Sequence, residues 1–304
     1  MGVSIVIPTY NERENITKLI PHIEDVLSKN SLKGEIIIID DNSPDGTGRI
    51  ADKLAKRYKN IRVIHRTSKK GVGSARKLGF SEAKKDIIIS MEGDTTHNPD
   101  FIPHFLKAIK EGADLVIGSR YLPKSKIINW PLKRRVVSKF ANKIANIFAG
   151  AKLTDVTSGY RAFTKKMYSK LYIESLGYPF NMEFACESWY RGFRIKEIPI
   201  TFVHRKKGKS KLSVLKEFIT FLRVVFKFSY TYRPVAVFGS LGGILTSVGF
   251  IVGLYVVYLE LSGRIESRFP LLILSLLLIV AGIQIFSFGL IVNVISKFRK
   301  EALK

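Results

Sequence analysis

Residues 35–41 read Glu-Ile-Ile-Ile-Ile-Asp-Asp, and residues 86–94 read Asp-Ile-Ile-Ile-Ser-Met-Glu-Gly-Asp. Each stretch is a short run of β-branched side chains that leads into carboxylates. Near-continuous apolar runs of this length are typical of strands that are buried on both faces, as in a parallel sheet. The two stretches therefore predict buried strands at 35–39 and 86–90, each followed by acidic residues.

Similar runs alternate with helical patterns through the first 120 residues. Further strands are predicted at 3–7, 62–64 and 114–118, and helices at 12–28, 46–58, 73–83 and 99–111. This alternation predicts an α/β fold with a doubly wound, mostly parallel sheet. Ligands of such sheets bind beyond the carboxyl ends of the strands, so the site is expected there.

Polar residues follow four of the predicted strands. These segments are Pro8–Glu12, Asp40–Gly46, Met91–Asp94 and Ser119–Tyr121. Glu92 and Asp94 stand two residues apart, and paired carboxylates at a strand end can hold Mg²⁺ or Mn²⁺ on the phosphates of a nucleotide diphosphate. A solvated acidic turn is the alternative, and the neighbouring Asp40 and Asp41 favour the metal site.

Charge and cysteine content narrow the class of protein. The 304 residues carry 50 Lys and Arg against 25 Asp and Glu, a formal net charge of +25. This balance favours an anionic partner: nucleic acid, a phosphorylated small molecule or an anionic membrane face. Nucleic acid is not expected, because the sequence has no basic recognition helix or RNA-binding motif. The single cysteine, Cys186, excludes a disulfide within the chain and a cysteine-based zinc site.

Two long stretches, 235–258 and 270–296, contain no charged residue. At about 1.5 Å per residue each can cross a bilayer core of about 30 Å, and the occurrence of two disfavours the alternative of buried core helices. Residues 212–232 mix apolar and basic side chains in a helical pattern, which favours an amphipathic helix at the membrane surface over a helix packed on the soluble domain. The expected organisation is a catalytic domain at 1–211, an interfacial helix at 212–233, and a transmembrane hairpin with a basic tail at 234–304.

The charges that flank these stretches predict their orientation. Four basic residues lie before the first span and four follow the second, whereas the turn between them has two, Arg264 and Arg268. The positive-inside rule then places the catalytic domain and both termini in the cytoplasm. No signal peptide is expected, because residues 1–12 have no basic leader and only a short apolar run. The prediction is an integral two-span membrane protein, of the cell membrane if prokaryotic.

Five short motifs follow one another along the chain. They are Pro8-Thr9-Tyr10-Asn11-Glu12, Asp40-Asp41-Asn42-Ser43-Pro44-Asp45-Gly46-Thr47, Gly71-Val72-Gly73-Ser74-Ala75-Arg76, Gly118-Ser119-Arg120-Tyr121 and Ser158-Gly159-Tyr160-Arg161-Ala162-Phe163. In this order, over about residues 3–212, they resemble the motifs of family 2 glycosyltransferases. The similarity is closest to the polyprenyl-phosphate glycosyltransferases, and among these to the dolichol-phosphate mannose synthases. The resemblance implies a GT-A fold and transfer of a sugar from a nucleotide sugar to a lipid phosphate.

The resemblance also implies roles for individual residues. The nucleotide would contact Pro8, Tyr10, Glu12, Ile39, Asp41, Glu92 and Gly93. The metal, Mg²⁺ or Mn²⁺, would be held by Glu92, Asp94 and Thr96. The donor and acceptor phosphates would be surrounded by Arg120, Arg134, Ser138, Arg205 and Lys211, and the catalytic residues would be Asp94, Arg120 and Arg205. Two residues depart from the family pattern: Glu92 replaces the usual Asp, and Thr96 stands where a Gln usually helps the metal.

Some of these residues also have structural interpretations. Asp155 and Arg161 could form an ion pair beneath the acceptor loop or could contact the acceptor. Residues 71–76 read mainly as a turn and the start of a helix. Residues 205–211 could be a solvated basic loop or a patch that binds lipid headgroups.

The expected reaction is an inverting transfer of mannose from GDP-mannose to dolichyl or polyprenyl phosphate at the cytoplasmic face of the membrane. A lipid phosphate is already an anion at pH 7, so it needs relief from repulsion by the donor more than it needs a general base. One alternative is a glucosyl- or N-acetylhexosaminyltransferase that uses a UDP-sugar. A different class of alternative is a catalytically dead membrane scaffold that binds nucleotide or lipid, against which the acidic residues Asp40, Asp41 and Asp94 argue.

Overall fold

The computed structural model describes residues 2–204, 214–262 and 269–302. The chain divides into two compact units, which are described separately. One comprises residues 1–146 and 151–221, and the other comprises residues 147–150 and 222–304.

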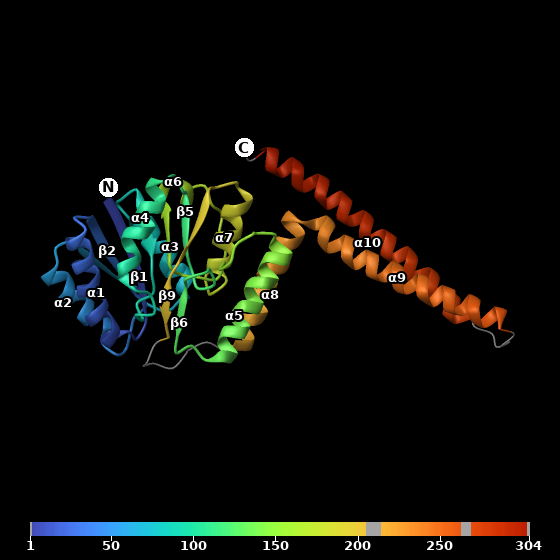
Figure 1. Cartoon of the computed structure of the whole chain (residues 1–304), viewed down its shortest axis with the longest axis horizontal. Helices are drawn as coiled ribbons and strands as arrows, with labels where there is room; N and C mark the ends of the chain where they lie inside the picture. Colours follow the sequence, from blue (N-terminus) through green and yellow to red (C-terminus); the bar gives the residue numbers. More distant parts are fainter. Residues whose placement is uncertain (1, 205–213, 263–268, 303–304) are drawn as a thin grey trace. The chain divides into compact units, whose positions relative to one another are not determined.

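A seven-stranded sheet forms the centre of the first unit (Figure 1). Its strands, in spatial order, are β3 (Ile61–His65), β2 (Lys33–Asp40), β1 (Gly2–Thr9), β4 (Ile87–Ser90), β7 (Arg161–Thr164), β5 (Leu115–Ser119) and β8 (Ile195–Pro199). Neighbouring strands run parallel except at β7, which pairs antiparallel with both β4 and β5. The predicted doubly wound, mostly parallel sheet is confirmed, and all five predicted strands are present.

Helices connect the strands. They are α1 (Arg13–Lys29), α2 (Thr47–Arg57), α3 (Val72–Glu82), the short 3₁₀ helix η1 (Pro99–Phe101), α4 (Ile102–Lys110), α5 (Leu132–Ala149), α6 (Lys165–Tyr168) and α7 (Phe180–Tyr190). The first four predicted helices correspond to α1, α2, α3 and η1 with α4. A small second sheet pairs β6 (Lys126–Ile128) with β9 (Thr201–Val203) in parallel.

The two faces of the central sheet are covered by different helices. Alternate residues of β1, such as Ile5 and Ile7, belong to a core that also contains apolar residues of α1, α2 and α4. On the other face Val6 packs against Gly79 of α3, where an added Cβ would lie 2.3 Å from Val6 Cγ1. An aromatic cluster completes this side, because Phe80 of α3 packs against Phe163 of β7 at 4.9 Å between ring centroids. Strands covered on both faces explain why their sequences are continuously apolar.

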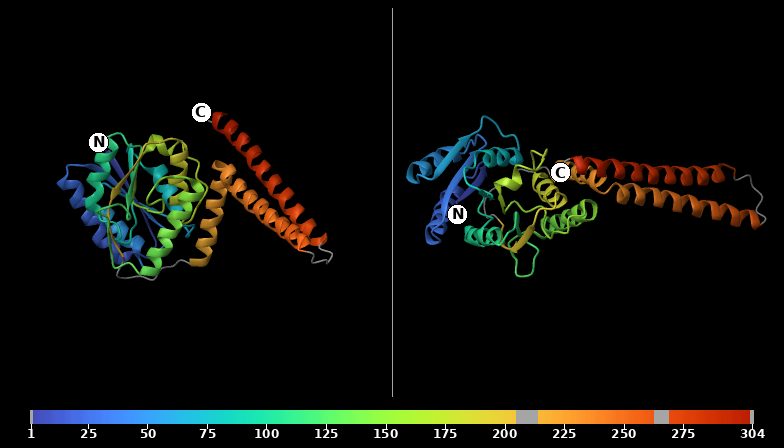
Figure 2. Two further views of the ribbon diagram at one scale, coloured as in Figure 1. Left: turned by 45° about the vertical axis from the view of Figure 1, so that its right-hand side comes forward. Right: turned by 90° about the horizontal axis from the view of Figure 1, so that it is seen from above.

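The second unit contains the end of α8 (Val214–Tyr232) and two long helices, α9 (Pro234–Leu261) and α10 (Phe269–Ala302). Helices α9 and α10 run side by side (Figure 2). Their apolar segments, Pro234–Leu261 and Phe269–Ser296, are long and apolar enough to cross a membrane. They coincide with the two predicted spans, and α8 is helical as expected. The location of these helices in or on a membrane stays a prediction.

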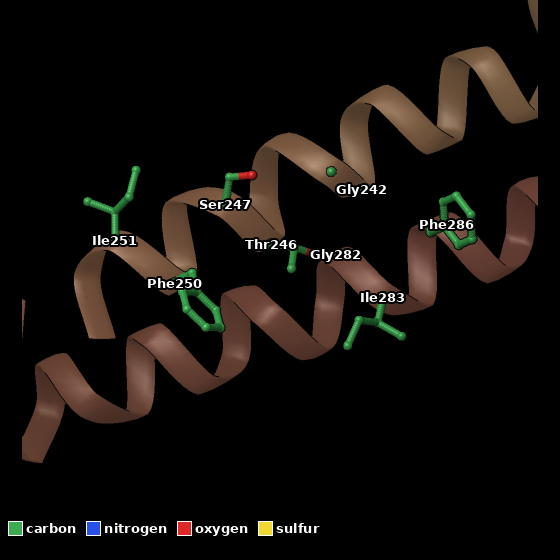
Figure 3. A pocket seen from close by; sticks show the side chains of 9 residues that line it. Gly242, Thr246, Ser247, Phe250, Ile251, Gly282, Ile283 and Phe286 are labelled. Atoms are coloured by element: carbon green, nitrogen blue, oxygen red, sulfur yellow. The ribbon is translucent and has the colours of Figure 1, made fainter. Parts of the chain in front are cut away.

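Glycines allow α9 and α10 to approach closely. A Cβ added at Gly242 would lie 2.5 Å from the carbonyl oxygen of Gly282, and Ser275 Oγ donates a hydrogen bond to the Gly249 carbonyl across the pair at 2.8 Å. Small residues at such contacts are typical of helix pairs in membranes. An open groove of about 620 Å³ follows the pair and is lined by residues that include Thr246, Phe250 and Phe286 (Figure 3).

Candidate active site

The loop after β2 is held by its own first carboxylate. Asp40 is 3% exposed and accepts hydrogen bonds from Ser43 Oγ at 2.5 Å and from the Ser43 amide at 3.2 Å. The Ser43 hydroxyl in turn accepts from the backbone N–H of Asn11 at 3.0 Å, which ties the loops after β1 and β2 together. Asp40 therefore has a structural role, because it holds the loops after β1 and β2 in place.

Asp41 lies next to it and has a different partner. Arg66 Nη1 donates to Asp41 Oδ1 at 2.7 Å, and Arg66 Nη2 donates to Ser74 Oγ at 2.5 Å. Burial raises the pKa of Asp41, and the charge of Arg66 opposes this rise. Sequence reasoning missed Arg66, although it directly follows β3 and so satisfies the same strand-end rule that identified the acidic residues.

The residues after β1 lie at the same edge. Pro8 is buried at the end of the strand, and Tyr10 lies beneath the ammonium group of Lys69, whose Nζ is 4.2 Å from the ring centroid. Glu12 Oε2 accepts from Asn15 Nδ2 at 2.6 Å, and the Glu12 amide donates to Thr47 Oγ1 at 2.8 Å. These contacts order the segment that was predicted to bind nucleotide.

Ile39, another member of the predicted nucleotide set, has a wholly buried side chain in the sheet. Its exposed fraction is 0%, and its Cγ1 would lie 3.3 Å from a Cβ added at Gly79 of α3. Its carbonyl accepts from Thr9 Oγ1 at 3.2 Å. In this structure the Ile39 side chain is part of the core.

After β4, Glu92 forms an ion pair with Arg76. Arg76 is 1% exposed and also donates to Asn181 Oδ1 at 2.9 Å. Gly159 makes room for the pair, since an added Cβ would lie 2.5 Å from Glu92 Oε1 and 2.7 Å from Arg76 Nη2. The end of the 71–76 motif is thus a buried arginine that fixes the first carboxylate of the acidic motif.

Asp94 is held by the turn that follows it. Its Oδ1 accepts from Thr96 Oγ1 at 2.6 Å and from the Thr96 amide at 3.2 Å. Thr95 between them has a φ of +61°, which a β-branched residue rarely adopts. Gly93 is buried, and an added Cβ would lie 3.0 Å from Thr9 Cγ2 at the end of β1. Thr96 thus orients Asp94 in this structure.

A divalent cation at this edge of the sheet would need oxygen ligands from these side chains. Among the described residues, no group of three or more His, Cys, Asp or Glu side chains could hold a metal ion. Mg²⁺ at phosphate sites is, however, usually bound by one or two carboxylates, while phosphates and water complete its shell. Glu92 and Asp94 provide such carboxylates at one strand end, so the donor set fits a cation that binds together with a diphosphate.

His97 supports the backbone of the acidic motif. Its Nδ1 accepts the Glu92 amide at 3.1 Å, and its ring stacks on Tyr160 at 4.8 Å between centroids. Burial lowers the pKa of His97 to about 4, so the ring is neutral at pH 7 and can accept this hydrogen bond. Tyr160 Oη donates to the Asn98 carbonyl at 3.0 Å, which fixes the other side of the turn.

Arg120, at the end of β5, forms a two-pronged ion pair with Asp155. Its Nε and Nη2 donate to the two Asp155 oxygens at 2.7 and 2.8 Å, and Nη2 also donates to Thr157 Oγ1 at 2.7 Å. Burial alone would raise the pKa of the fully buried Asp155, but Arg120 outweighs burial and lowers it. The suggested pairing of Asp155 with Arg161 is wrong, because Arg161 donates instead to the carbonyls of Ser158 and Asn181.

The remaining predicted phosphate ligands lie on α5 or in undescribed parts of the chain. Both Ser138 and Arg134 lie on α5. Ser138 accepts a hydrogen bond from Tyr121 Oη at 2.8 Å, and the side chain of Arg134 is exposed. Arg205 and Lys211 lie outside the described residues. The structure therefore brings together Arg120, Tyr121 and Ser138, and the binding of phosphate by this group stays a prediction.

Comparison with known proteins identifies relatives over most of the chain. Residues 4–172 match the family model of glycosyl transferase family 2. A polyprenol monophosphomannose synthase of Mycolicibacterium smegmatis is 38% identical over 216 residues, which is 69% of this chain and 80% of the relative. A dolichol-phosphate mannosyltransferase of Pyrococcus furiosus is 36% identical over 258 residues, 83% and 72% of the two chains. An undecaprenyl-phosphate mannosyltransferase of Micrococcus luteus is 39% identical over 219 residues, 70% and 88% of the two chains.

Solved structures share the fold at lower identity. Glucosyl-3-phosphoglycerate synthase from Mycobacterium tuberculosis superposes with a TM-score of 0.56 and 20% identity, over 75% of this chain and 78% of that one. Mannosyl-3-phosphoglycerate synthase from Rubrobacter xylanophilus gives a TM-score of 0.56 and 16% identity, over 76% and 74% of the two chains. At these identities the likeness concerns the GT-A fold alone.

Proposed function

Because this chain belongs to glycosyl transferase family 2 and is a glycosyltransferase, we propose that it transfers a mannosyl residue from GDP-mannose to a polyprenyl phosphate at the cytoplasmic face of a membrane. Three mannosyltransferases named for polyprenyl, dolichyl and undecaprenyl phosphates, each at least 36% identical, support the sugar and the acceptor. The proposed donor base comes from the resemblance to the mannose synthases, and the proposed membrane face comes from the charges that flank the two apolar stretches.

The observation that carries the proposal is the contrast between the two sides of the site. Carboxylates follow β2 and β4, whereas Arg120 follows β5 and lies over the ring of Tyr121, whose hydroxyl donates to Ser138. Asp155 balances the charge of Arg120, so the positive charge on this side would come from the exposed Arg134 of α5 together with the predicted Arg205 and Lys211. A donor diphosphate with a cation suits the acidic side, and an acceptor phosphate suits the basic side. Two apolar helices in the same chain agree with an acceptor that resides in a membrane.

We assign the donor site to Pro8, Tyr10, Glu12 and Asp41, with Glu92 and Asp94 at the diphosphate. A divalent cation held there by Glu92 and Asp94 would neutralise the negative charge of the leaving nucleotide. Arg76 and Thr96 keep the two carboxylates in place before the substrate arrives, so little reorganisation is needed when the donor binds.

We assign the acceptor phosphate to Arg120, Arg134 and Ser138, together with Arg205 and Lys211, which lie outside the described residues. Basic side chains reduce the repulsion between the acceptor and donor phosphates, and arginine forks match phosphate oxygens in geometry. The acceptor oxygen attacks the anomeric carbon while the bond to the nucleotide diphosphate breaks. A single displacement of this kind inverts the configuration at the anomeric carbon.

The test is a donor screen with the purified full chain in detergent and a polyprenyl phosphate. Radiolabelled GDP-mannose, UDP-glucose and UDP-N-acetylglucosamine are supplied separately, and transfer of label into the lipid fraction is measured. We expect label from GDP-mannose, and loss of that label in EDTA with recovery on adding Mg²⁺ or Mn²⁺. Transfer from a UDP-sugar alone would replace the proposed donor, and full turnover in EDTA would overturn the metal site.

A further inference from the structure

Helix α10 carries one carboxamide near the middle of its apolar segment. Gln284 lies 15 residues from Phe269 and 12 residues from Ser296, the ends of that segment. At about 1.5 Å per residue these separations are about 22 and 18 Å, so the amide would sit near the centre of a bilayer. The inference that follows rests on the proposed anchoring of α9 and α10 in a membrane.

The Gln284 amide has no hydrogen-bond partner within the described part of the chain. It is exposed, and it does not line the groove between α9 and α10. Two serines of the same helix differ, because Ser275 Oγ donates to the Gly249 carbonyl and Ser287 Oγ donates to the Ile283 carbonyl. A polar group exposed to hydrocarbon without a partner costs several kcal/mol, so a lone amide at this depth requires a partner.

The surface around Gln284 is apolar and continuous. Leu277, Val280, Phe288 and Ile291 precede and follow it at intervals of four and seven residues, and each is at least 44% exposed. The face of α10 that packs on α9 is a different one, marked by Ser275 and Gly282. We name the stripe of Leu277, Val280, Gln284, Phe288 and Ile291 the Gln284 stripe.

We propose that two copies of this chain associate in the membrane through the Gln284 stripe, with the two Gln284 amides hydrogen-bonded to each other. A carboxamide both donates and accepts, so it is complementary to itself. A second copy inserted in the same orientation necessarily presents its amide at the same depth. A prenyl chain cannot fill this role, because hydrocarbon has no group that accepts or donates a hydrogen bond.

Disulfide crosslinking in vesicles tests the arrangement. The chain's single cysteine, Cys186, is buried and is replaced by Ala, after which Ile291→Cys and Leu290→Cys are compared. Both positions are exposed, but Leu290 points about 120° away from Gln284 around the helix. We expect Ile291→Cys to crosslink two chains readily and Leu290→Cys to do so weakly. Equal crosslinking at both positions, or none at either, would overturn the pairing.

A second measurement isolates the amide. Fluorescence energy transfer between labelled copies in vesicles gives the dissociation constant of the pair. Gln284→Leu should weaken pairing by about 5- to 30-fold, Gln284→Asn should retain part of it, and Leu290→Ile, outside the stripe, should leave it unchanged. An unchanged constant in Gln284→Leu would refute the role of the amide and point to another membrane protein as its partner.

Two controls separate this inference from the proposals on which it depends. Release of the protein from vesicles by alkaline carbonate would overturn the membrane anchoring and the pairing together. Mannosyl transfer is assayed on the same vesicles. Crosslinking at Ile291→Cys without any transfer by the parent protein would overturn the proposed function and support the pairing.

Discussion

At the scale of single residues, the carboxylates at the carboxyl edge of the sheet have separate partners. Asp40 orders its own loop through Ser43, and Asp41 pairs with Arg66. Glu92 pairs with the buried Arg76, whereas Asp94 is oriented by the hydroxyl and amide of Thr96. Asp94 keeps the carboxylate that the family pattern has at this position, so we expect it to matter most for a bound cation.

Replacing Asp94 with Asn should lower turnover by roughly 10²-fold, about 2.7 kcal/mol in the activation barrier, because a carboxylate ligand of the cation is lost. The fold should persist, since Asn has nearly the same shape and the site is at the edge of the sheet. Initial rates with saturating donor and a thermal unfolding curve check the two parts. Asp100→Asn, at an exposed aspartate paired with His22, is the matched control. An Asp94→Asn protein as active as the parent would contradict the assignment.

Asp155 and Arg120 form a buried ion pair, and its loss should lower the free energy of unfolding. Asp155→Asn leaves the guanidinium buried without its counter-charge, which should cost about 3 kcal/mol. Thermal unfolding in detergent would show the loss. Asp114→Asn breaks a longer, more exposed pair with Arg194 at 3.5 Å and should cost less than about 1 kcal/mol. Similar melting temperatures for the two variants would contradict the buried-pair argument.

The same pair predicts a dependence of stability on pH. The folded-state pKa of Asp155 is lowered, so its contribution is present above the ordinary carboxyl value of 3.8 and is lost as pH falls through the lower folded-state value. The melting temperature of the parent should therefore fall more steeply below about pH 4 than that of Asp155→Asn. Parallel curves for the two proteins over that range would rule out this contribution.

At the scale of elements, neighbouring glycines on α9 offer a matched comparison. A Cβ at Gly242 would meet the Gly282 carbonyl oxygen at 2.5 Å, whereas nothing lies within 4 Å of a Cβ at Gly243. Gly242→Ala should destabilise the helix pair by about 1–3 kcal/mol through overpacking, and Gly243→Ala should be neutral or slightly stabilising. Unfolding by SDS in mixed micelles measures both. Equal effects would show that the close approach of α9 and α10 does not hold them together.

At the scale of the whole molecule, charge predicts the membrane orientation. Both termini and the catalytic domain should be cytoplasmic, because basic residues flank the outer ends of the two apolar stretches. Ser262→Cys, at the end of α9, should react with a membrane-impermeant maleimide added outside intact cells. A cysteine placed at Lys29, at the end of α1, is the control and should react only after lysis. Reaction of Ser262→Cys only after lysis would refute the orientation.

The order of strands and helices through residue 119 was determined by local sequence. Buried parallel strands must be apolar on both faces, so the strands at 35–40 and 87–90 can be predicted without any tertiary information. The gathering of acidic and polar residues could also be predicted, because the carboxyl ends of parallel strands lie at one edge of the sheet. The two apolar stretches were equally clear, since length and the absence of charge suffice to predict them.

Only the tertiary structure decided which charges meet. Arg76 and Glu92 are 16 residues apart, and Arg120 and Asp155 are 35 apart, so no local pattern links them. The antiparallel β7 between β4 and β5 brings the second of these pairs and the buried Arg161 to the site, and its four residues, Arg-Ala-Phe-Thr, do not encode direction. Pairing across such separations depends on packing of the whole sheet, which is why the sequence predicts the candidate site and the tertiary structure selects the partners within it.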